Sequence, residues 1–283
     1  MPQIAAILNL TTDSFWEPSR YDMSVLESGA DIIDIGAVST RPGAAEVSLE
    51  EEWARLEPVL ARLAARSGCA QVLSAEPLPT DSVSARPLPS SGIPIISIDT
   101  TRAEIVRRSF ELLGHFIVND ISAGEDDPQM LPLVGKLGLD YIAMHKRGNP
   151  RTMDSLTDYG SDGASAFAAS ASAAGESAPR ACLDALVDYF KAFELRAAGF
   201  GIKDWILDPG LGFAKTPEQC WYILEHLEEL KALGHPILIG AADKRFTAGR
   251  TEEAHLLALR HGADILRVHD VASARATIVK YCL

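Results

Sequence analysis

Residues 93–101 read IPIISIDTT, an isoleucine-rich apolar run that ends abruptly in an aspartate and two threonines. A run of this length fits a strand that is buried on both faces, and the polar residues after it mark where the strand leaves the sheet. The same arrangement recurs along the chain. The eight runs are IAAIL (4–8), DIIDI (31–35), IPIISI (93–98), HFIVN (115–119), LDYIAM (139–144), DWIL (204–207), PILIG (236–240) and ADILRV (263–268).

Stretches with a helical pattern lie between most of these runs. Buried strands that alternate with helices are typical of a parallel sheet covered by those helices. Eight such units predict an α/β fold of the (β/α)8, or TIM, barrel type, and 283 residues fit a single domain over residues 1–283. The active site of this fold lies at the carboxyl ends of the strands. We therefore expect the polar residues that follow the runs to line one pocket.

Composition and charge narrow the function classes. A net charge of −13 with no basic stretch argues against binding to nucleic acid or to a membrane surface. No run approaches the roughly 18 apolar residues of a membrane span. The cysteines (Cys69, Cys182, Cys220 and Cys282) are far apart, which indicates neither a zinc site nor a disulfide framework. Because the first strand begins almost at Met1, we expect no signal peptide and a cytoplasmic enzyme.

Two segments interrupt the alternation of strands and helices. Residues 70–92 are rich in proline and serine and precede the third strand, which predicts a surface insertion on the face opposite the active site. Residues 160–179 form a low-complexity alanine and serine segment, predicted to be either a loose helix or mobile. A single helix, at 251–262, is expected between the seventh and eighth strands.

Polar or charged residues stand at the ends of the runs and are the candidates for the pocket: Asn9, Asp99, Asn119, Asp208, Lys244, Arg267 and His269. The two carboxylates could accept N–H donors from the edge of a flat 2-amino-4-oxo heterocycle, and Lys244 could donate to its oxo group or a ring nitrogen. Plainer interpretations stay open. Asp99 or Thr100 could cap the next helix, and Asn119 could be a buried amide with its hydrogen bonds satisfied.

The segment RVHD (267–270) closes the eighth run and favours the binding of an anion. Arg267 and His269 are two residues apart, so a strand places them on one face, where a cation and an imidazole suit an anionic leaving group. Arg41, in the segment STRPGA, is a second candidate for a phosphate or a carboxylate, although Pro-Gly makes a turn in any protein. Asn9 offers an uncharged oxygen that suits Mg²⁺ when a ligand's phosphates supply most of the negative charge.

The segment GLGFAKTPE follows the sixth run. Thr216 is expected to cap a helix that has Pro217 as its first residue. Phe213 could belong either to the core or to the wall of a ligand pocket. His145, after the fifth run, could point inward, and no role is assigned to it.

Taken together, these segments resemble the dihydropteroate synthase family along nearly the whole chain. The matching segments, in family order, are ILNLTTDSF, GADIIDIGAVSTRPGA, ISIDTT, IVNDIS, MHKRGNP, LDPGLGFAKT, ADKRF and GADILRVHDV. The resemblance implies the (β/α)8 fold and a homodimer. It also implies an enzyme that joins 4-aminobenzoate to 6-hydroxymethyl-7,8-dihydropterin diphosphate, releasing diphosphate and yielding 7,8-dihydropteroate for folate synthesis.

The resemblance also implies roles for individual residues. The pterin ring would be held by Asp99, Asn119, Asp208 and Lys244. The diphosphate and its Mg²⁺ would be held by Asn9, Arg267 and His269. The catalytic set would be Lys244, Arg267, His269 and Arg41, because stabilising the departing anion is expected to be the largest catalytic contribution. Mobile loops would carry Thr40, Arg41 and Pro42 in one case and Phe15 and Glu17 in the other, and Phe213 would line the aminobenzoate slot.

The chain departs from the family pattern at several positions. In the first loop Glu17 replaces an aspartate and Pro18-Ser19 replaces two glycines, which could stiffen loop closure. After the seventh strand Ala242-Asp243 stands where the family has Ser-Arg, so a hydroxyl that would bind the aminobenzoate carboxylate is missing. Asp243 also brings a negative charge near the expected place of another anion.

Two other functions remain as alternatives. A non-catalytic pterin-binding homologue that acts as a partner or regulator explains the altered segments more easily. A related barrel that transfers a methyl group from folate to a corrinoid protein fits less well, because no diphosphate leaves in that reaction, and STRPGA and RVHD are suited to an anion.

Overall fold

The protein is described by a computed structural model that defines residues 1–11, 22–39, 46–67, 94–148, 152–160, 177–242 and 244–283. The predicted insertion at 70–92 falls outside these ranges, as does most of the predicted alanine and serine segment. The last residues of that segment begin a helix at Ser177. Within the described ranges, no helix is long and apolar enough to cross a membrane.

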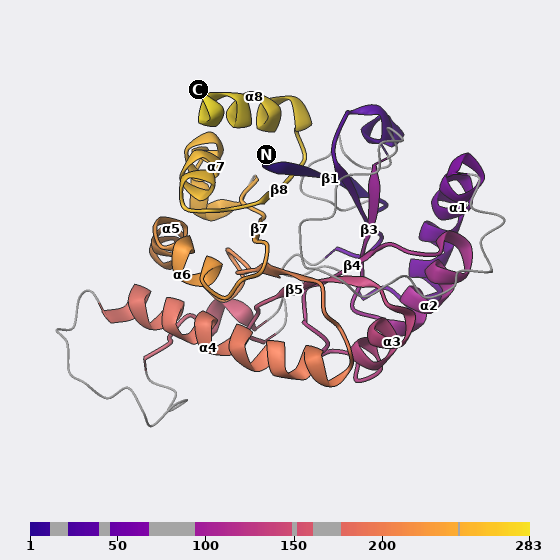
Figure 1. Cartoon of the computed structure of the whole chain (residues 1–283), viewed down its shortest axis with the longest axis horizontal. Coiled ribbons are helices and arrows are strands. Elements are labelled where there is room, and N and C mark those ends of the chain that lie inside the picture. Colours follow the sequence, from indigo (N-terminus) through magenta and orange to yellow (C-terminus); the bar gives the residue numbers. More distant parts are fainter. Residues whose placement is uncertain (12–21, 40–45, 68–93, 149–151, 161–176, 243) are drawn as a thin grey trace.

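Eight parallel strands form a barrel, as the sequence predicts (Figure 1). Their bounds are β1 Gln3–Asn9, β2 Ile32–Gly36, β3 Ile95–Asp99, β4 Ile117–Asp120, β5 Asp140–Met144, β6 Trp205–Asp208, β7 Leu238–Ile239 and β8 Ile265–Val268. The hydrogen-bonded order runs from β6 through β1 and β8 to β7. A parallel bridge between Leu207 and Ile237 joins β6 to the start of the seventh run and completes the circle.

Helices surround the strands on the outside of the barrel (Figure 1). The longer ones are α1 Leu49–Ser67, α2 Ala103–Leu113, α3 Met130–Leu137, α4 Ser177–Gly199, α5 Pro217–Glu225, α7 Thr251–Arg260 and α8 Val271–Cys282. The shorter ones are η2 Met23–Glu27, η4 Met153–Ser155, α6 Leu227–Lys231 and η5 Arg245–Thr247. The connection from β7 to β8 therefore holds the turn η5 as well as α7, where the sequence predicts one helix.

Two apolar layers hold the barrel together. The larger one lies between the outer faces of the strands and the helices. The smaller one fills the interior and takes one side chain from each strand: Ala5, Ile32, Ile95, Ile117, Ile142, Ile206, Leu238 and Ile265. Since side chains of a strand alternate between its two faces, the residue two positions after each of these points into the same interior, nearer the carboxyl ends. This interior layer is therefore the floor on which the polar residues stand.

The residues that cap α5 and α2 test two predictions made from the sequence. Thr216 caps α5 and accepts a hydrogen bond from the Gln219 amide at 3.2 Å, with Pro217 as the first helical residue, as predicted. At α2 the capping residue is Arg102, which makes no capping bond through its side chain. Thr100 Oγ1 accepts from the Arg102 amide at 3.2 Å, but Asp99 is the last residue of β3. The interpretation of Asp99 or Thr100 as the residue that caps α2 is therefore wrong.

Candidate active site

Five polar side chains form the layer directly above the apolar floor. Each lies two residues after a floor residue on its strand, so the alternation of the strand points it into the barrel. They are Asp34 on β2, Ser97 on β3, Asn119 on β4, Asp208 on β6 and Arg267 on β8. Residues from five strands therefore meet in one place, although Asp34 and Arg267 are 233 positions apart in the sequence.

Asp34 is the centre of this layer. Its buried carboxylate accepts hydrogen bonds from Ser97 Oγ at 2.6 Å, from Asn119 Nδ2 at 3.0 Å and from Arg267 Nε at 2.6 Å. A buried carboxylate is stable only when such donors replace the lost water. Asp34 thereby fixes which way the Asn119 amide points and where the Arg267 guanidinium sits. The interpretation of Asn119 as a buried amide with a partner is correct for its Nδ2.

Arg267 connects this layer to the next one towards the mouth. Its Nη2 donates to Asp99 Oδ2 at 2.8 Å, while its Nε is held by Asp34. Burial raises the pKa of Asp99, and the Arg267 charge only partly offsets this while Asp34 adds to it. Gly36 lies opposite Asp99 in the strand register, and a Cβ there would come within 3.4 Å of Asp99 Cβ. The small residue therefore leaves room for the carboxylate.

A second group stands on the other wall of the mouth. Asp208 accepts from the Gly210 amide at 2.8 Å through Oδ1. Lys244 Nζ donates to the Leu211 carbonyl at 2.5 Å and lies 4.8 Å from the centre of the Phe213 ring. Burial raises the pKa of Asp208, and the Lys244 charge partly offsets this rise. Burial also lowers the pKa of Lys244, and the Asp208 charge partly offsets that fall. Phe213 is therefore a partly exposed platform beneath an ammonium rather than a core residue.

Asn9 and His269 complete the described candidates. Asn9 ends β1 opposite Gly36, at the same level as Asp99. His269 follows β8 directly, and burial lowers its pKa to about 4, with the neighbouring Arg267 charge as a smaller cause. The imidazole is therefore neutral at pH 7, and an incoming anion would have to bind it through a neutral N–H or raise its pKa.

Asp34, Lys215 and His145 also belong to this region, and the sequence assigns none of them a role in the site. Asp34 stands inside an apolar run, and its alternation with floor residue Ile32 is the signal that could have identified it. Lys215 and His145 are both buried and lie 2.9 Å apart, from Lys215 Nζ to His145 Nδ1. No pattern in the sequence pairs them, because they come from different loops.

Five predicted site residues lie outside the described residues: Phe15, Glu17, Thr40, Arg41 and Pro42. Asp243 does so as well, whereas its neighbour Ala242 is described and packs against the larger apolar layer. The roles assigned to these residues stay predictions.

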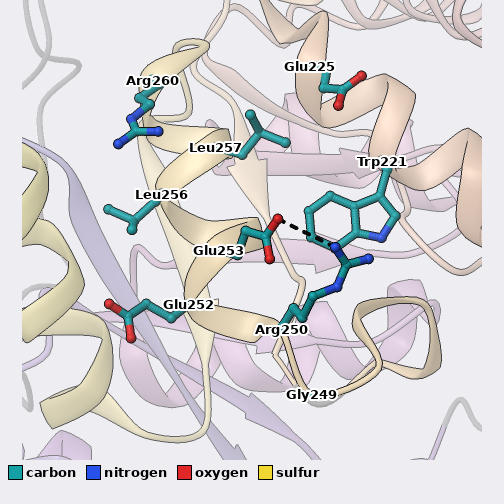
Figure 2. A pocket seen from close by; sticks show the side chains of 9 residues that line it. All are labelled: Trp221, Glu225, Gly249, Arg250, Glu252, Glu253, Leu256, Leu257 and Arg260. Atoms are coloured by element: carbon teal, nitrogen blue, oxygen red, sulfur yellow. Dashed lines mark hydrogen bonds and ion pairs between the residues drawn. The ribbon is translucent and has the colours of Figure 1, made fainter.

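Two cavities in the described part of the chain differ in their relation to this site. One of about 500 Å³ is bordered by His269, Asp22 and Arg275, beside the start of α8. The other, of about 610 Å³, lies between α5 and α7 on the outside of the barrel. Figure 2 shows Arg250 there, with its guanidinium 4.4 Å from the centre of the Trp221 ring and 3.4 Å from the Glu253 carboxylate. It contains none of the candidate residues, so this cavity does not mark the candidate active site.

The donor set decides how a metal ion could bind. Among the described residues, no group of three or more His, Cys, Asp or Glu side chains is arranged to hold a metal. Asn9 is a neutral oxygen donor at the mouth, and Arg267 lies in the same region. This arrangement fits a cation that enters with its own anionic ligand, and it does not fit a cage built by the protein alone.

Comparisons with known proteins agree with this geometry. The family model described as pterin binding enzyme matches residues 5–74 and 87–269. A dihydropteroate synthase of Synechocystis sp. is 35% identical over 300 residues, which cover 98% of this chain and 88% of that protein.

Solved structures give the same result. The dihydropteroate synthase of Yersinia pestis, in a sulfonamide complex, has 28% identity and a TM-score of 0.75, and covers 99% of this chain and 93% of its own. That of Thermus thermophilus, in complex with 4-aminobenzoate, has 29% identity and a TM-score of 0.73, with the same coverage of 99% and 93%. The resemblance seen in the sequence is confirmed: the chain belongs to the pterin-binding enzyme family, among its dihydropteroate synthases.

Proposed function

We propose that the chain condenses 6-hydroxymethyl-7,8-dihydropterin diphosphate with 4-aminobenzoate to give 7,8-dihydropteroate and diphosphate. The observation that carries this proposal is the pairing of two walls in one mouth. Asp208 and Lys244 form one wall, and Asp99 and Arg267 form the other. A 2-amino-4-oxo ring has N–H donors for the carboxylates and an oxo acceptor for the ammonium.

The chemistry follows from the charges. As the bond between the pterin methylene and diphosphate lengthens, negative charge collects on the leaving oxygen and positive charge on the methylene. In this proposal Arg267 and His269 would donate to that oxygen, while the carboxylates would stay beside the electron-poor ring. Donors and charges that are already in place need no reorganisation as the charge develops, which is how such a site accelerates the reaction. The arylamine of 4-aminobenzoate would then form a C–N bond at the methylene once the C–O bond to diphosphate has broken, and the proton that its nitrogen loses would pass to water or to the released diphosphate.

Magnesium belongs to the proposal through Asn9. The Asn9 side-chain oxygen would hold the ion together with oxygens of the diphosphate, and the ion would supply positive charge to the leaving group. In a titration of dihydropterin diphosphate binding against Mg²⁺, Asn9→Ala should require a higher Mg²⁺ concentration. Binding of the pterin without its diphosphate should stay unchanged in the same variant.

A homodimer and a cytoplasmic location complete the proposal. The support for both is membership of the family. Sedimentation of the purified chain would test the dimer.

The experiment that tests the function measures diphosphate release with Mg²⁺ and dihydropterin diphosphate, with and without 4-aminobenzoate. Release that depends on 4-aminobenzoate is the expected result. Binding of dihydropterin diphosphate with release only at the background rate would instead favour the second candidate, a non-catalytic pterin-binding homologue. The observation that favours this candidate is a feature of the sequence: Ala242-Asp243 stands where the family has Ser-Arg.

A further inference from the structure

A buried lysine lies beneath the loop that follows β6. Lys215 Nζ is 2.9 Å from His145 Nδ1, and it donates to the carbonyls of Gly210 at 3.2 Å and Phe213 at 3.1 Å. An ammonium has three N–H donors, and each meets one of these three acceptors. Lys215 therefore holds both ends of the segment from Gly210 to Phe213 from below.

His145 fixes the position of that ammonium. Burial lowers the pKa of His145 well below its usual range, and the Lys215 charge lowers it further, so the imidazole is neutral and its Nδ1 accepts from Lys215. The backbone carbonyl of His145 also lies against the same loop, because a Cβ on Gly210 would come within 2.1 Å of it. The end of β5 and the loop after β6 are thus joined at two points.

A second lysine holds the same segment from the side of the mouth. Lys244 Nζ donates to the Leu211 carbonyl at 2.5 Å and lies 4.8 Å from the centre of the Phe213 ring. The two lysines therefore share one short stretch of backbone. If the segment moves, the support of the Lys244 ammonium moves with it.

We infer that Lys215, held by the neutral His145, is a positioning residue that sets the Gly210–Phe213 loop and, through it, the place of the Lys244 ammonium. The inference rests on the proposed function, because it assumes that Lys244 binds the pterin and Phe213 the aminobenzoate. It predicts that Lys215 affects ligand binding without contacting either ligand.

The arrangement also predicts how ligand binding depends on pH. Burial lowers the pKa of Lys215 to about 8. Above that pH the amine has only two N–H donors for three acceptors, so one contact is lost and ligand binding should weaken. Folding stability moves the other way. The pKa of Lys215 in the folded chain lies below its unfolded value of 10.5, so the free energy of unfolding rises between about pH 8 and 10.5. Weaker binding in this range would therefore not reflect unfolding.

The ionisable groups that face Lys215 come from several elements. They are His145 after β5, Cys182 on α4, Cys220 on α5, Asp208 on β6 and Lys244 after β7. Burial raises the pKa of Cys182 to about 11 and raises that of Cys220, so both thiols are neutral near pH 8. Burial also lowers the pKa of Lys244. A Lys215→Arg variant separates the two lysines, because arginine stays charged throughout this range.

The test is a double-mutant cycle measured by calorimetry with dihydropterin diphosphate. Lys215→Met should raise the Kd roughly tenfold, as expected when a charged donor is lost. In the double mutant with Lys244→Met, the increases in Kd from the two substitutions should be less than additive. In the double mutant with Asp99→Asn, a residue on the opposite wall, the two increases should add. Additive effects with Lys244, or an unchanged Kd in a folded Lys215→Met protein, would overturn the inference. Lys191→Met, an exposed lysine on α4, is the matched control.

Further measurements keep the test decisive. Lys215→Arg should bind the ligand without weakening above pH 8, and His145→Gln, which keeps an acceptor for the ammonium, should weaken binding less than His145→Leu. Both can be measured if Lys215→Met fails to fold. In the ligand-free protein, hydrogen exchange at the amides of Gly212 and Phe213 should be faster in His145→Leu than in wild type. Equal exchange in the two proteins would contradict the inference, whether or not the chain binds pterin. Failure of the wild-type chain to bind pterin would contradict the proposed function instead.

Discussion

Arg267 and Asp34 are 233 residues apart in the chain and form a hydrogen-bonded ion pair of 2.6 Å inside the barrel. Asp34 also accepts from Asn119, so one carboxylate orients both a candidate anion-binding cation and a candidate pterin-binding amide. Asp34 thus connects a residue proposed to bind the diphosphate with a residue proposed to bind the pterin ring. Removing the Asp34 charge should have two opposite effects on the binding of an anionic ligand, one through charge and one through the orientation of Arg267 and Asn119.

Asp34→Asn should raise the Kd for dihydropterin diphosphate by roughly ten- to a hundredfold, the range for losing a hydrogen bond between charged groups. Removing a negative charge alone would tighten the binding of an anion, so weaker binding would show that orientation dominates. Calorimetry measures the Kd. Ser97→Ala, which leaves the bond between Asp34 and Arg267 in place, is the control and should change the Kd only slightly. Tighter binding by Asp34→Asn would contradict the positioning role.

Pterin binding should strengthen as the pH rises through about 7. Burial raises the pKa of Asp99 to about 7, and only the ionised carboxylate accepts N–H donors from the ring through both of its oxygens. Binding of 6-hydroxymethyl-7,8-dihydropterin, which carries no diphosphate to titrate, should be about tenfold weaker at pH 6 than at pH 8. Asp99→Asn should remove this dependence, and a wild-type Kd that is flat with pH would contradict it.

The same shift has the opposite effect on folding. The pKa of Asp99 is higher in the folded chain than the ordinary 3.8, so its contribution to stability is greatest below about pH 4. That contribution is lost as the pH rises towards 7. Thermal unfolding of wild type and Asp99→Asn across this range separates the effect on stability from the effect on binding.

Asp208→Ala should abolish pterin binding while leaving the fold intact. The carboxylate is buried, accepts from the Gly210 amide and lies near the Lys244 charge, so its removal should lower the free energy of unfolding without unfolding the barrel. Calorimetry gives the affinity, and circular dichroism with thermal unfolding checks the fold. An unchanged affinity for the pterin would refute the assignment of this residue.

Gly210→Ala should destabilise the protein by roughly 2–4 kcal/mol, from a left-handed backbone and a steric clash. Gly210 has a φ of +65°, and a Cβ there would lie 2.1 Å from the His145 carbonyl oxygen. Gly212→Ala is the matched control. Its φ is +80°, but the nearest atom to a Cβ is Lys244 Cδ at 3.5 Å, so only the backbone cost of about 1 kcal/mol applies. Chemical denaturation measures both, and equal losses would argue against the clash.

Replacing Ala242-Asp243 with Ser-Arg should lower the KM for 4-aminobenzoate. The change adds a hydroxyl donor and replaces a negative charge with a positive one beside a carboxylate ligand. The KM for dihydropterin diphosphate should be unaffected. An unchanged aminobenzoate KM would mean that the carboxylate is held elsewhere or that this substrate is not used.

The sequence by itself determined the fold and the level of the site. Eight apolar runs, separated mostly by helix-patterned stretches, predict a parallel sheet covered by helices, and eight such units fit a closed barrel, which the strand order confirms. The side-chain alternation of a strand then places Asn119, Asp208 and Arg267 above the floor formed by residues such as Ile117 and Ile265. These are local properties of the chain, so they can be read one strand at a time.

Tertiary structure alone decided which side chains meet. Asp34 looked like part of an apolar strand until β3, β4 and β8 each brought a donor to it. Lys215 and His145 are 70 positions apart and become partners only because β5 and β6 are neighbours. A hydrogen bond depends on distances of a few tenths of an ångström, and closure of the whole barrel sets those distances, whereas the pattern of any single segment does not.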